Sequence, residues 1–397
     1  MKNNISPKRI LFHYMLGIPT GGSDHSLYNH LKQLDKKQFY PVVFFSAESF
    51  HYEKLQKLGI EVHIKKVPKV KKKQSKEILH TEGISKTVIK TGLIEFLKVN
   101  FGREIKALVK TLPEVFFLYK EIKKNKIDIL HTNFNLSASR GAVIAGIIAR
   151  IPVIVHNRGL SNLLRIDVLL SRFVKEIICI SDFVKKEYTE KGISEKKCRV
   201  IFNGVDTEKF IPSNNEQRDK LIIASVGRLE KWKGQSVLIK AASMLLEKYK
   251  NIEFWLIGNG SEKNNLVQIV ELNGIKQYVK FLGEVNNVNE YLTKVDIFVH
   301  TSIEPEPFGR VIIESMACRL PVVATKIGGP LEIIDNNVNG ILIEPNNVLE
   351  LVLTLEILIK DFELRKKLGQ NALTKVLSHF SIQSTTLKIQ NSYLNNE

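Results

Sequence analysis

Short apolar segments rich in β-branched and aromatic residues alternate with segments of helical periodicity along nearly the whole chain. This alternation predicts parallel strands joined by helices, which is the pattern of a doubly wound α/β sheet. The pattern runs twice, and a polar stretch at 203–219 separates the two halves. A chain of 397 residues is also too long for one hydrophobic core. We therefore predict two Rossmann-like α/β domains that face each other across a cleft.

The predicted strands fix the expected domain limits. Those of the first half are Arg9–Tyr14, Tyr40–Ser46, Val62–Lys66, Ile127–His131, Val153–His156, Glu176–Ile180 and Cys198–Phe202. Those of the second half are Leu221–Gly227, Glu253–Gly258, Val279–Leu282, Ile297–Thr301, Val322–Ala324 and Gly340–Ile343. We expect an N-terminal domain over 1–210 with a basic helical insertion at about 65–126, a C-terminal domain over 211–380, and a last helix in 381–397.

Composition indicates a soluble globular protein, with 44% hydrophobic and 25% charged residues. The longest apolar candidate, Ala142–Ala149, is far shorter than the ~18 residues of a spanning helix. Three scattered cysteines, Cys179, Cys198 and Cys318, lack metal-ligand spacing and suggest a reducing compartment. We expect a cytoplasmic protein, with a peripheral position at the inner face of the cell membrane as the second option.

Positive charge is concentrated in one segment of a chain whose formal net charge is +18. Residues 65–126 contain 17 Lys and Arg against 6 Asp and Glu, a net +11. The segment also predicts a helix with an apolar stripe, formed by Ile89, Leu93, Leu97, Phe101, Ile105, Leu108, Leu112 and Phe116. Such a helix can lie on an anionic bilayer. We favour inward packing of the stripe on the first sheet, since packing accounts for most amphipathic helices.

The segment from Glu306 to Glu314 holds two carboxylates eight positions apart, with Pro307 and Gly309 between them. Pro307 prevents a helix from extending back to Glu306, so Glu306 lies in a loop and Glu314 in the helix that follows. Backbone N–H groups at the start of that helix attract anions. A ligand with both hydroxyl and phosphate groups, such as a nucleotide-sugar, suits this arrangement. An acidic loop beside a solvated helix is the alternative.

Two cations lie in the loop after the strand Leu221–Gly227. Arg228 and Lys233 follow this strand directly, and a helical pattern begins after Gly234. Ligands bind at the carboxyl ends of strands in open α/β sheets. A guanidinium fork and an ammonium group together can hold a diphosphate. Two solvated loop cations are the alternative.

These motifs resemble the family-four retaining glycosyltransferases, of the bacterial surface-polysaccharide type, which have the GT-B fold. The resemblance covers most of the chain and also includes Asn203-Gly204-Val205-Asp206, Gly258-Asn259-Gly260, Phe281-Leu282-Gly283 and Gly328-Gly329. It implies that Arg228 and Lys233 bind the donor diphosphate, that Glu306 lies near the donor sugar, and that Glu314 binds the ribose. It also implies that backbone amides around Phe308, Gly309 and Arg310 cradle sugar and phosphate oxygens. Gly258, Gly283 and Val285 would lie at the donor base and phosphates, and the last helix would return to the N-terminal domain.

Three loops of the first half carry further predicted site residues. Gly21 and Gly22 follow the first strand, where glycines let backbone amides approach a phosphate, although a plain tight turn is equally compatible. His131 ends a strand; the resemblance implies contact with the donor sugar, and a structural His bonded to backbone is the alternative. Arg158 also follows a strand and could meet an acidic or phosphorylated acceptor.

The resemblance implies an enzyme that moves a sugar from a UDP- or GDP-sugar to a hydroxyl acceptor, a glycan or a lipid-linked acceptor of cell-envelope synthesis. Catalysis would rest on positioning and on stabilising the leaving diphosphate. The sequence contains no Asp-x-Asp pair for a metal–diphosphate clamp, so no metal and no cofactor is expected. A nucleotide-sugar epimerase of the same fold and a basic nucleic-acid-binding or membrane-binding protein are the alternatives. We expect no nucleic acid partner, because the lysines lack interleaved aromatic residues.

Overall fold

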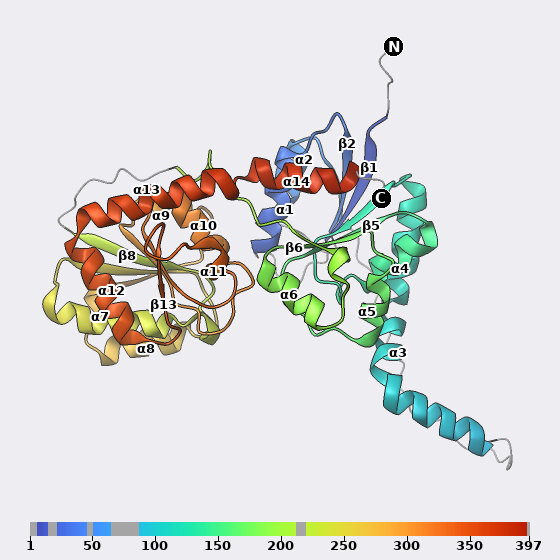
Figure 1. Ribbon diagram of the computed structural model, residues 1–397, viewed down its shortest axis with the longest axis horizontal. Helices are drawn as coiled ribbons and strands as arrows, with labels where there is room; N and C mark the ends of the chain where they lie inside the picture. Colours follow the sequence, from blue (N-terminus) through green and yellow to red (C-terminus); the bar gives the residue numbers. More distant parts are fainter. Residues whose placement is uncertain (1–5, 15–21, 46–50, 65–86, 212–219, 395–397) are drawn as a thin grey trace. The chain divides into compact units, whose positions relative to one another are not determined.

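A computed structural model describes residues 6–14, 22–45, 51–64, 87–211 and 220–394, with side chains from 102 onward in the helix that begins at Thr87. The chain folds into two compact units (Figure 1). Unit 1 comprises Met1–Ile180, Val184–Val200 and Ser392–Glu397, and unit 2 comprises Ser181–Phe183 and Ile201–Asn391.

Unit 1 is built on a seven-stranded sheet in the order β3-β2-β1-β4-β5-β6-β7. The strands are β1 Lys8–Tyr14, β2 Phe39–Phe45, β3 Glu61–Ile64, β4 Ile129–Thr132, β5 Val153–Asn157, β6 Glu176–Cys179 and β7 Cys198–Val200. The helices are α1 Gly22–Gln33, α2 Tyr52–Lys57, α3 Thr87–Lys124, α4 Arg140–Ala149, α5 Arg165–Ser171 and α6 Asp182–Glu190, with a 3₁₀ turn at η1 Glu195–Lys197. All neighbouring strands pair in parallel, as crossover connections through helices require.

Unit 2 repeats this architecture around a six-stranded parallel sheet in the order β10-β9-β8-β11-β12-β13. The strands are β8 Leu221–Val226, β9 Ile252–Ile257, β10 Val279–Gly283, β11 Ile297–His300, β12 Val322–Thr325 and β13 Ile341–Ile343. The helices are α7 Gln235–Lys248, α8 Lys263–Leu272, α9 Asn289–Leu292, α10 Arg310–Ala317, α11 Pro330–Ile333, α12 Val348–Lys360, α13 Phe362–His379 and α14 Ile382–Leu394, with 3₁₀ turns at η2 Lys231–Lys233 and η3 Lys276–Tyr278. The residues of α14 from Ser392 onward belong to unit 1.

The predicted fold class is confirmed, since both halves form parallel α/β sheets. Each predicted strand is present, and its ends shift by no more than about two residues, as is usual for element boundaries. Gly22, Ser23 and Asp24 form the first turn of α1. Asp24 in this first turn suits the positive end of the helix dipole.

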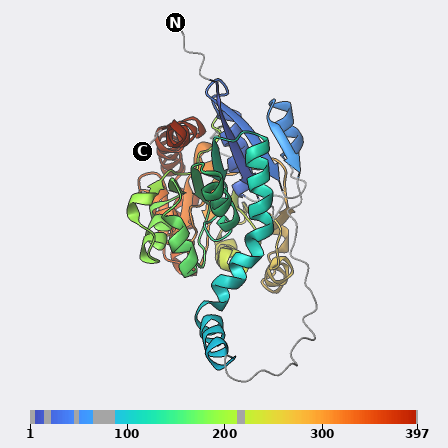
Figure 2. The same ribbon diagram turned by 90° about the vertical axis from the view of Figure 1, so that its right-hand side faces the viewer.

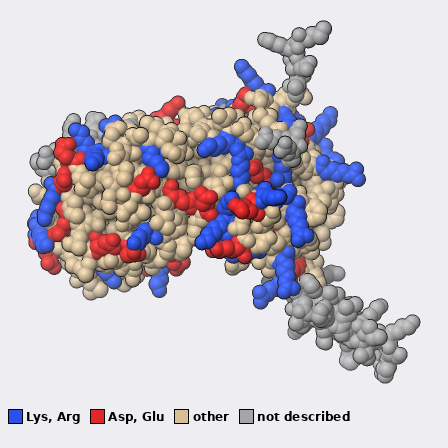
Figure 3. All heavy atoms as spheres, viewed as in Figure 1, with Lys and Arg blue, Asp and Glu red and all other residues tan. Residues whose placement is uncertain are grey.

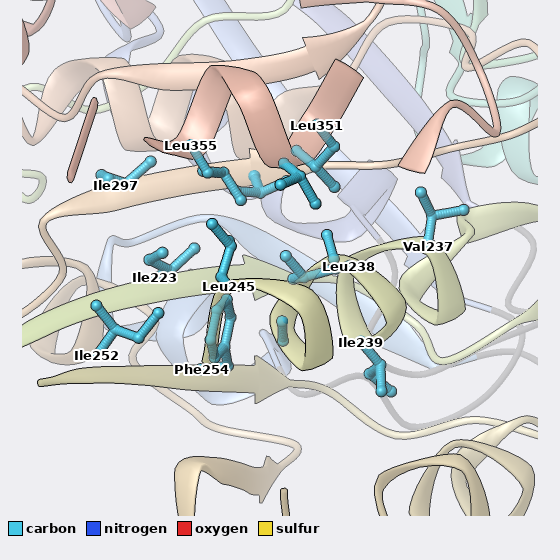
Figure 4. Packing of buried hydrophobic residues seen from close by; sticks show 14 of the residues in the cluster. Ile223, Val237, Leu238, Ile239, Leu245, Ile252, Phe254, Ile297, Leu351 and Leu355 are labelled. Carbon is cyan, nitrogen blue, oxygen red and sulfur yellow. The ribbon is translucent and has the colours of Figure 1, made fainter. Parts of the chain in front are cut away.

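The core of unit 2 shows why this sequence forms these layers. Strands β8 and β9 contribute Ile223 and Phe254, and α7 contributes Leu238 and Leu245 at helical spacing. Leu355 of α12 joins them, and all five side chains are at most 1% exposed. Figure 4 shows the leucine side chains of α7 and α12 pointing toward one another. Full burial of each such side chain contributes about 1.5–3 kcal/mol.

The packing of α3 in unit 1 corrects one prediction. Three members of the predicted inward stripe, Ile105, Leu112 and Phe116, are 46%, 46% and 71% exposed. The buried face is formed instead by neighbouring residues such as Val115 and Leu118. Figure 2 shows α3, in cyan and teal, as a long helix that runs alongside the blue strands of unit 1. Helix α3 carries two apolar stripes. The predicted stripe is exposed, and the stripe that includes Val115 and Leu118 packs against α4 and the sheet. The predicted members before 102 lie outside the described side chains.

In both sheets the strand order reverses next to the first strand of the unit. In unit 2, β8 lies between β9 and β11, so the chain leaves β8 and β11 toward opposite sides of the sheet. In unit 1, β1 lies between β2 and β4 in the same way. Carboxyl ends of strands beside such a reversal are the usual ligand-binding place in open α/β sheets. The topology therefore marks the loops after β8 and β11, and those after β1 and β4, as the places where a ligand would bind.

Gly234 fixes the loop that follows β8. Its backbone is left-handed, with φ +64°, and a Cβ there would lie 2.1 Å from the carbonyl oxygen of Thr301. Only glycine allows the β8 loop to approach the chain after β11 this closely. The approach brings the loops that follow β8 and β11 into direct backbone contact.

We predict that Gly234→Ala destabilises the protein much more than Gly274→Ala. Gly274 has the matching φ of +65° and nothing within 4 Å of an added Cβ, so it isolates the backbone cost of about 1 kcal/mol. The steric contact at 234 should add about 1–3 kcal/mol. Urea unfolding of both variants measures the difference, and equal losses would contradict the close approach.

Candidate functional site

The loop after β8 carries the two predicted cations. Arg228 is exposed, and the Nε2 of Gln235 donates to its carbonyl oxygen at 2.9 Å, which ties the start of α7 to the loop. The backbone N–H of Lys233 donates to the Glu230 carbonyl oxygen at 2.9 Å, which closes the short 3₁₀ turn η2. Arg228 and Lys233 therefore lie at the carboxyl end of β8, beside the strand reversal, as predicted.

Lys233 and Glu306 form an ion pair. The Nζ of Lys233 donates to Oε2 of Glu306, and the two side chains are only 13% and 14% exposed. The same Nζ lies 4.2 Å from the centroid of the Trp232 ring, a cation–π contact. The pair joins the loops after β8 and β11, whose strands are neighbours in the sheet. The structure thus brings together two predicted site residues 73 positions apart.

Two residues that sequence reasoning did not select complete this cluster. His300 ends β11, and its Nε2 lies 3.5 Å from Oε2 of Glu306. The Oγ of Ser302 donates to the same oxygen at 3.4 Å and lies 3.3 Å from the Nε2 of His300. A polar residue at the end of an apolar strand is the signal that could have identified His300. The same signal was used for His131.

The electrostatics of the cluster follow from its burial. Burial alone would raise the pKa of the Glu306 carboxyl, but the hydrogen bond from His300 and the charge of Lys233 outweigh it and lower that pKa to about 2. Burial lowers the pKa of His300, although contact with Glu306 acts in the opposite direction. At neutral pH the cluster therefore holds a carboxylate and a neutral imidazole that donates from Nε2.

The segment from Phe308 to Glu314 follows directly. Phe308 is 2% exposed, and its ring packs near those of Phe202 and Phe380. Gly309 adopts φ +100° at the N-cap of α10, which begins at Arg310. The Nη2 of Arg310 donates to Oε1 of Glu314 at 2.6 Å, one helical turn along α10. The predicted loop and helix positions of these residues agree with the structure.

Chain segment 306–308 is held in place by the loop after β12. The backbone N–H of Gly329 donates to the Glu306 carbonyl oxygen at 2.7 Å. A Cβ at Gly328, where φ is +71°, would lie 2.5 Å from that same oxygen. The Glu306 backbone is therefore fixed from the β12 side while its carboxylate is fixed from the β8 side.

The remaining predicted residues of unit 2 lie at the ends of the next strands. Gly258 follows β9, and its N–H donates to the carbonyl oxygen of Gly283, the last residue of β10, at 2.7 Å. Val285 lies two residues further on and is partly buried. These three residues share the carboxyl edge of the sheet with the cluster around Glu306.

Unit 1 has its own polar group at the carboxyl edge of its sheet. The Nε of Arg158, just after β5, donates to Oδ1 of Asn133 at 2.9 Å. The Nδ2 of Asn133 in turn donates to the Ser23 carbonyl oxygen in the first turn of α1, at 3.1 Å. Gly22 begins this helix, and Gly21 lies outside the described residues. The structure thus joins Arg158 to the first turn of α1 through Asn133, which sequence reasoning did not select.

His131 occupies a different environment from the other predicted residues. Its ring is 1% exposed, and its Nδ1 lies 2.9 Å from the hydroxyl of Tyr393. The rings of Phe12 and His156 lie 5.1 Å and 5.4 Å away between centroids. Burial lowers the pKa of His131 well below its usual value. These contacts favour the structural alternative, with a tyrosine hydroxyl in place of a backbone partner.

The described residues offer neither a metal-ligand group nor a membrane-spanning helix. No group of three or more His, Cys, Asp or Glu side chains among them could hold a metal ion. None of the helices in the described part of the chain combines the length and apolar character needed to span a bilayer. The chemistry offered by the unit 2 cluster is that of cations, a carboxylate and helix N–H groups.

We predict that Glu306→Gln lowers the free energy of unfolding at pH 7 by on the order of 3 kcal/mol. The folded pKa of about 2 lies below the ordinary carboxyl value. The stabilisation is therefore complete above about pH 4.3 and is lost as the pH falls toward 2. Urea unfolding at pH 7 and pH 3 should show the difference from wild type shrinking by about half. The exposed Glu304→Gln is the control, and a pH-independent difference would contradict this electrostatic account.

Each half of the chain matches a model of a known protein family. Residues 206–375 match the model described as Glycosyl transferases group 1, and residues 50–209 match Glycosyltransferase Family 4. An uncharacterized glycosyltransferase of Methanocaldococcus jannaschii is 30% identical over 261 residues, 63% of this chain and 70% of that protein. The Escherichia coli UDP-Gal:alpha-D-GlcNAc-diphosphoundecaprenol alpha-1,3-galactosyltransferase is 25% identical over 314 residues, 72% of this chain and 80% of that protein.

Similarity extends to the fold. The crystal structure of HepE from Anabaena in complex with UDP-glucose has a TM-score of 0.75 and 24% identity, and the match covers 97% of this chain and 99% of that chain. Other curated relatives align over 50% to 61% of their own length. The chain belongs to the group 1, family 4 glycosyltransferases, nucleotide-sugar-dependent enzymes of the GT-B fold.

Proposed function

We propose that this protein is a retaining glycosyltransferase that moves a sugar from a UDP- or GDP-sugar to the hydroxyl of a glycan or lipid-linked acceptor in cell-envelope synthesis. The observation that carries the proposal is the Lys233–Glu306 ion pair beside the strand reversal of unit 2. A buried cation with one carboxylate partner can exchange that partner for a phosphate. The released carboxylate can then accept hydrogen bonds from sugar hydroxyls.

Arg228 and Lys233 act on the leaving diphosphate in this proposal. Arg228 is exposed at the carboxyl end of β8 and can present its planar fork to two phosphate oxygens. Lys233 adds a point charge from the same loop. Charge that develops on the diphosphate as the sugar departs is stabilised by both groups, which lowers the barrier without a metal ion. Glu306 orients the sugar, and His300 with Ser302 holds its carboxylate in place.

The start of α10 receives the rest of the donor. Amides of a first helical turn have no helical acceptor, so those around Phe308, Gly309 and Arg310 suit phosphate and sugar oxygens. Glu314 accepts hydrogen bonds from the ribose hydroxyls, with Arg310 holding one of its oxygens. Gly258, Gly283 and Val285 line the same edge of the sheet and contact the base and phosphates through their backbone.

Unit 1 binds the acceptor in this proposal, and the predicted boundaries near 210 and 380 remain predictions. Arg158 binds an acidic or phosphorylated group of the acceptor, and the role of Gly21 and Gly22 in donor binding stays a prediction. His131 has a structural role in this proposal, because its hydrogen bond to Tyr393 fixes helix α14 to the core of unit 1. An undecaprenol-linked acceptor is named for the Escherichia coli relative, which supports a lipid-linked acceptor and a position at the inner face of the cell membrane. Family membership disfavours both the epimerase and a nucleic-acid-binding role.

The first experiment is a thermal-shift panel of UDP, GDP and ADP with their common sugar conjugates, in the presence of EDTA. We predict a rise in the unfolding temperature with one base family in wild type. Arg228→Ala should abolish most of this rise, while the exposed Lys231→Ala in the same loop should keep it. No rise with any nucleotide would overturn the proposed donor site. A rise that requires a divalent cation would overturn its metal independence.

We also predict different kinetic effects for the two ends of the donor site. Arg228→Ala should lower kcat by about 10²-fold or more, because its charge acts in the transition state. Arg228→Lys should recover part of this loss. Glu314→Ala should raise the nucleotide Kd about tenfold through lost ribose contacts and change kcat less. Normal turnover in Arg228→Ala would contradict the leaving-group role.

A further inference from the structure

Helix α3 exposes an apolar stripe to solvent. Ile105, Val109, Leu112 and Phe116 follow one another at intervals of four, three and four residues, which places them on one helical face. Their exposed fractions are 46%, 47%, 46% and 71%. Single exposed apolar residues are ordinary, but a continuous stripe is not. We call these four residues the α3 ridge.

The helix that carries the ridge is anchored to unit 1 by its other face. The same helix is fixed to unit 1 through buried Leu118 and Ile122 and through a ring contact between Phe117 and Phe44 of β2 at 6.1 Å. The Nζ of Lys123 donates to the Ala149 carbonyl oxygen at the end of α4, at 3.3 Å. Unit 1 therefore holds α3 firmly by one face and presents the other to solvent.

Cations accompany the ridge. The described side chains of α3 include six Lys and Arg residues that are all exposed: Arg103, Lys106, Lys110, Lys120, Lys123 and Lys124. They include three acids, of which Glu114 and Glu121 are buried and Glu104 is partly buried. Figure 3 shows Lys and Arg side chains gathered over this part of unit 1. A surface that is both apolar and cationic matches an anionic bilayer, whose headgroups attract the cations while its acyl chains receive the apolar groups.

We propose that the α3 ridge and its flanking lysines form a membrane-docking surface specific for anionic lipid. Phe116 and Leu112 insert at the boundary between headgroups and acyl chains, and Lys106 and Lys110 contact lipid phosphates. The biological purpose of this docking rests on the proposed function, because docking would bring unit 1 to an acceptor held in the membrane. The docking chemistry itself is independent of the donor site in unit 2.

Vesicle flotation of the full chain tests the proposal. Wild type should float with vesicles that contain phosphatidylglycerol and remain unbound with pure phosphatidylcholine. Phe116→Ser should weaken binding about tenfold, which corresponds to the loss of one large apolar contact. Lys106→Glu/Lys110→Glu should weaken it by at least about fivefold per residue and make the remainder less salt-sensitive. Equal binding to both lipids, or no binding to either, would overturn the proposal.

Matched control variants distinguish binding through the ridge from nonspecific adsorption to vesicles. Leu272→Ser removes an exposed apolar residue, 87% exposed, from unit 2, and Lys366→Glu/Lys367→Glu reverses two exposed charges on α13. Both control variants should bind vesicles as wild type does. Loss of binding in the controls equal to that in the ridge variants would show unspecific adsorption and overturn the proposal.

Three further readouts distinguish lipid from other occupants of the ridge and test the donor site separately. Sedimentation velocity without lipid should give one monomeric species, and a dimer that Phe116→Ser dissociates would identify a second copy of the chain as the true occupant. Release of the protein from vesicles by a short DNA duplex, unaffected by Phe116→Ser, would also overturn the lipid assignment. Calorimetric titration with UDP should be unchanged in every ridge variant. Failure of UDP binding in wild type with intact vesicle binding would refute the proposed function alone.

Discussion

In unit 2 every strand pairs in parallel with its neighbours, so all six carboxyl ends lie along one edge of the sheet. The reversal of strand order between β8 and β11 sends their following helices to opposite faces, and the two loops remain side by side. Lys233 and Glu306 meet there because of this topology. A carboxylate that is 14% exposed needs a compensating charge, and the cation of the neighbouring loop supplies it.

This cluster is stabilised from several directions rather than by one contact. Gly234 lets the β8 loop touch the backbone after β11, and Gly329 bonds the Glu306 carbonyl from the β12 side. His300 and Ser302 add hydrogen bonds to the carboxylate. The geometry of the proposed donor site is therefore built into the protein before a ligand binds, and a ligand would replace partners rather than organise the loops.

Much of this arrangement could be predicted from the sequence, because parallel strands leave long apolar signals and their ends mark functional loops. Arg228 and Lys233 were selected because they follow such a strand, and Glu306 and Glu314 were selected for their spacing around Pro307 and Gly309. Contacts across 73 positions, such as that of Lys233 with Glu306, depend on strand order, which local patterns do not encode. His300 was missed because it sits at the end of a strand already assigned to the core. The orientation of α3 was predicted wrongly because periodicity identifies apolar stripes but does not choose between two of them.

The buried side chain of Tyr393 connects the end of the chain to its beginning. It packs against Phe39 of β2, with ring centroids 5.4 Å apart, and its hydroxyl reaches His30 of α1 and His131 of β4. Helix α14 thus supplies a core residue to a sheet whose first strand begins 385 residues earlier in the chain. The N-terminal sheet consequently cannot complete its core before Tyr393 has been synthesised. A partly made first unit leaves an aromatic vacancy at its centre, and its core closes only when this distant segment becomes available.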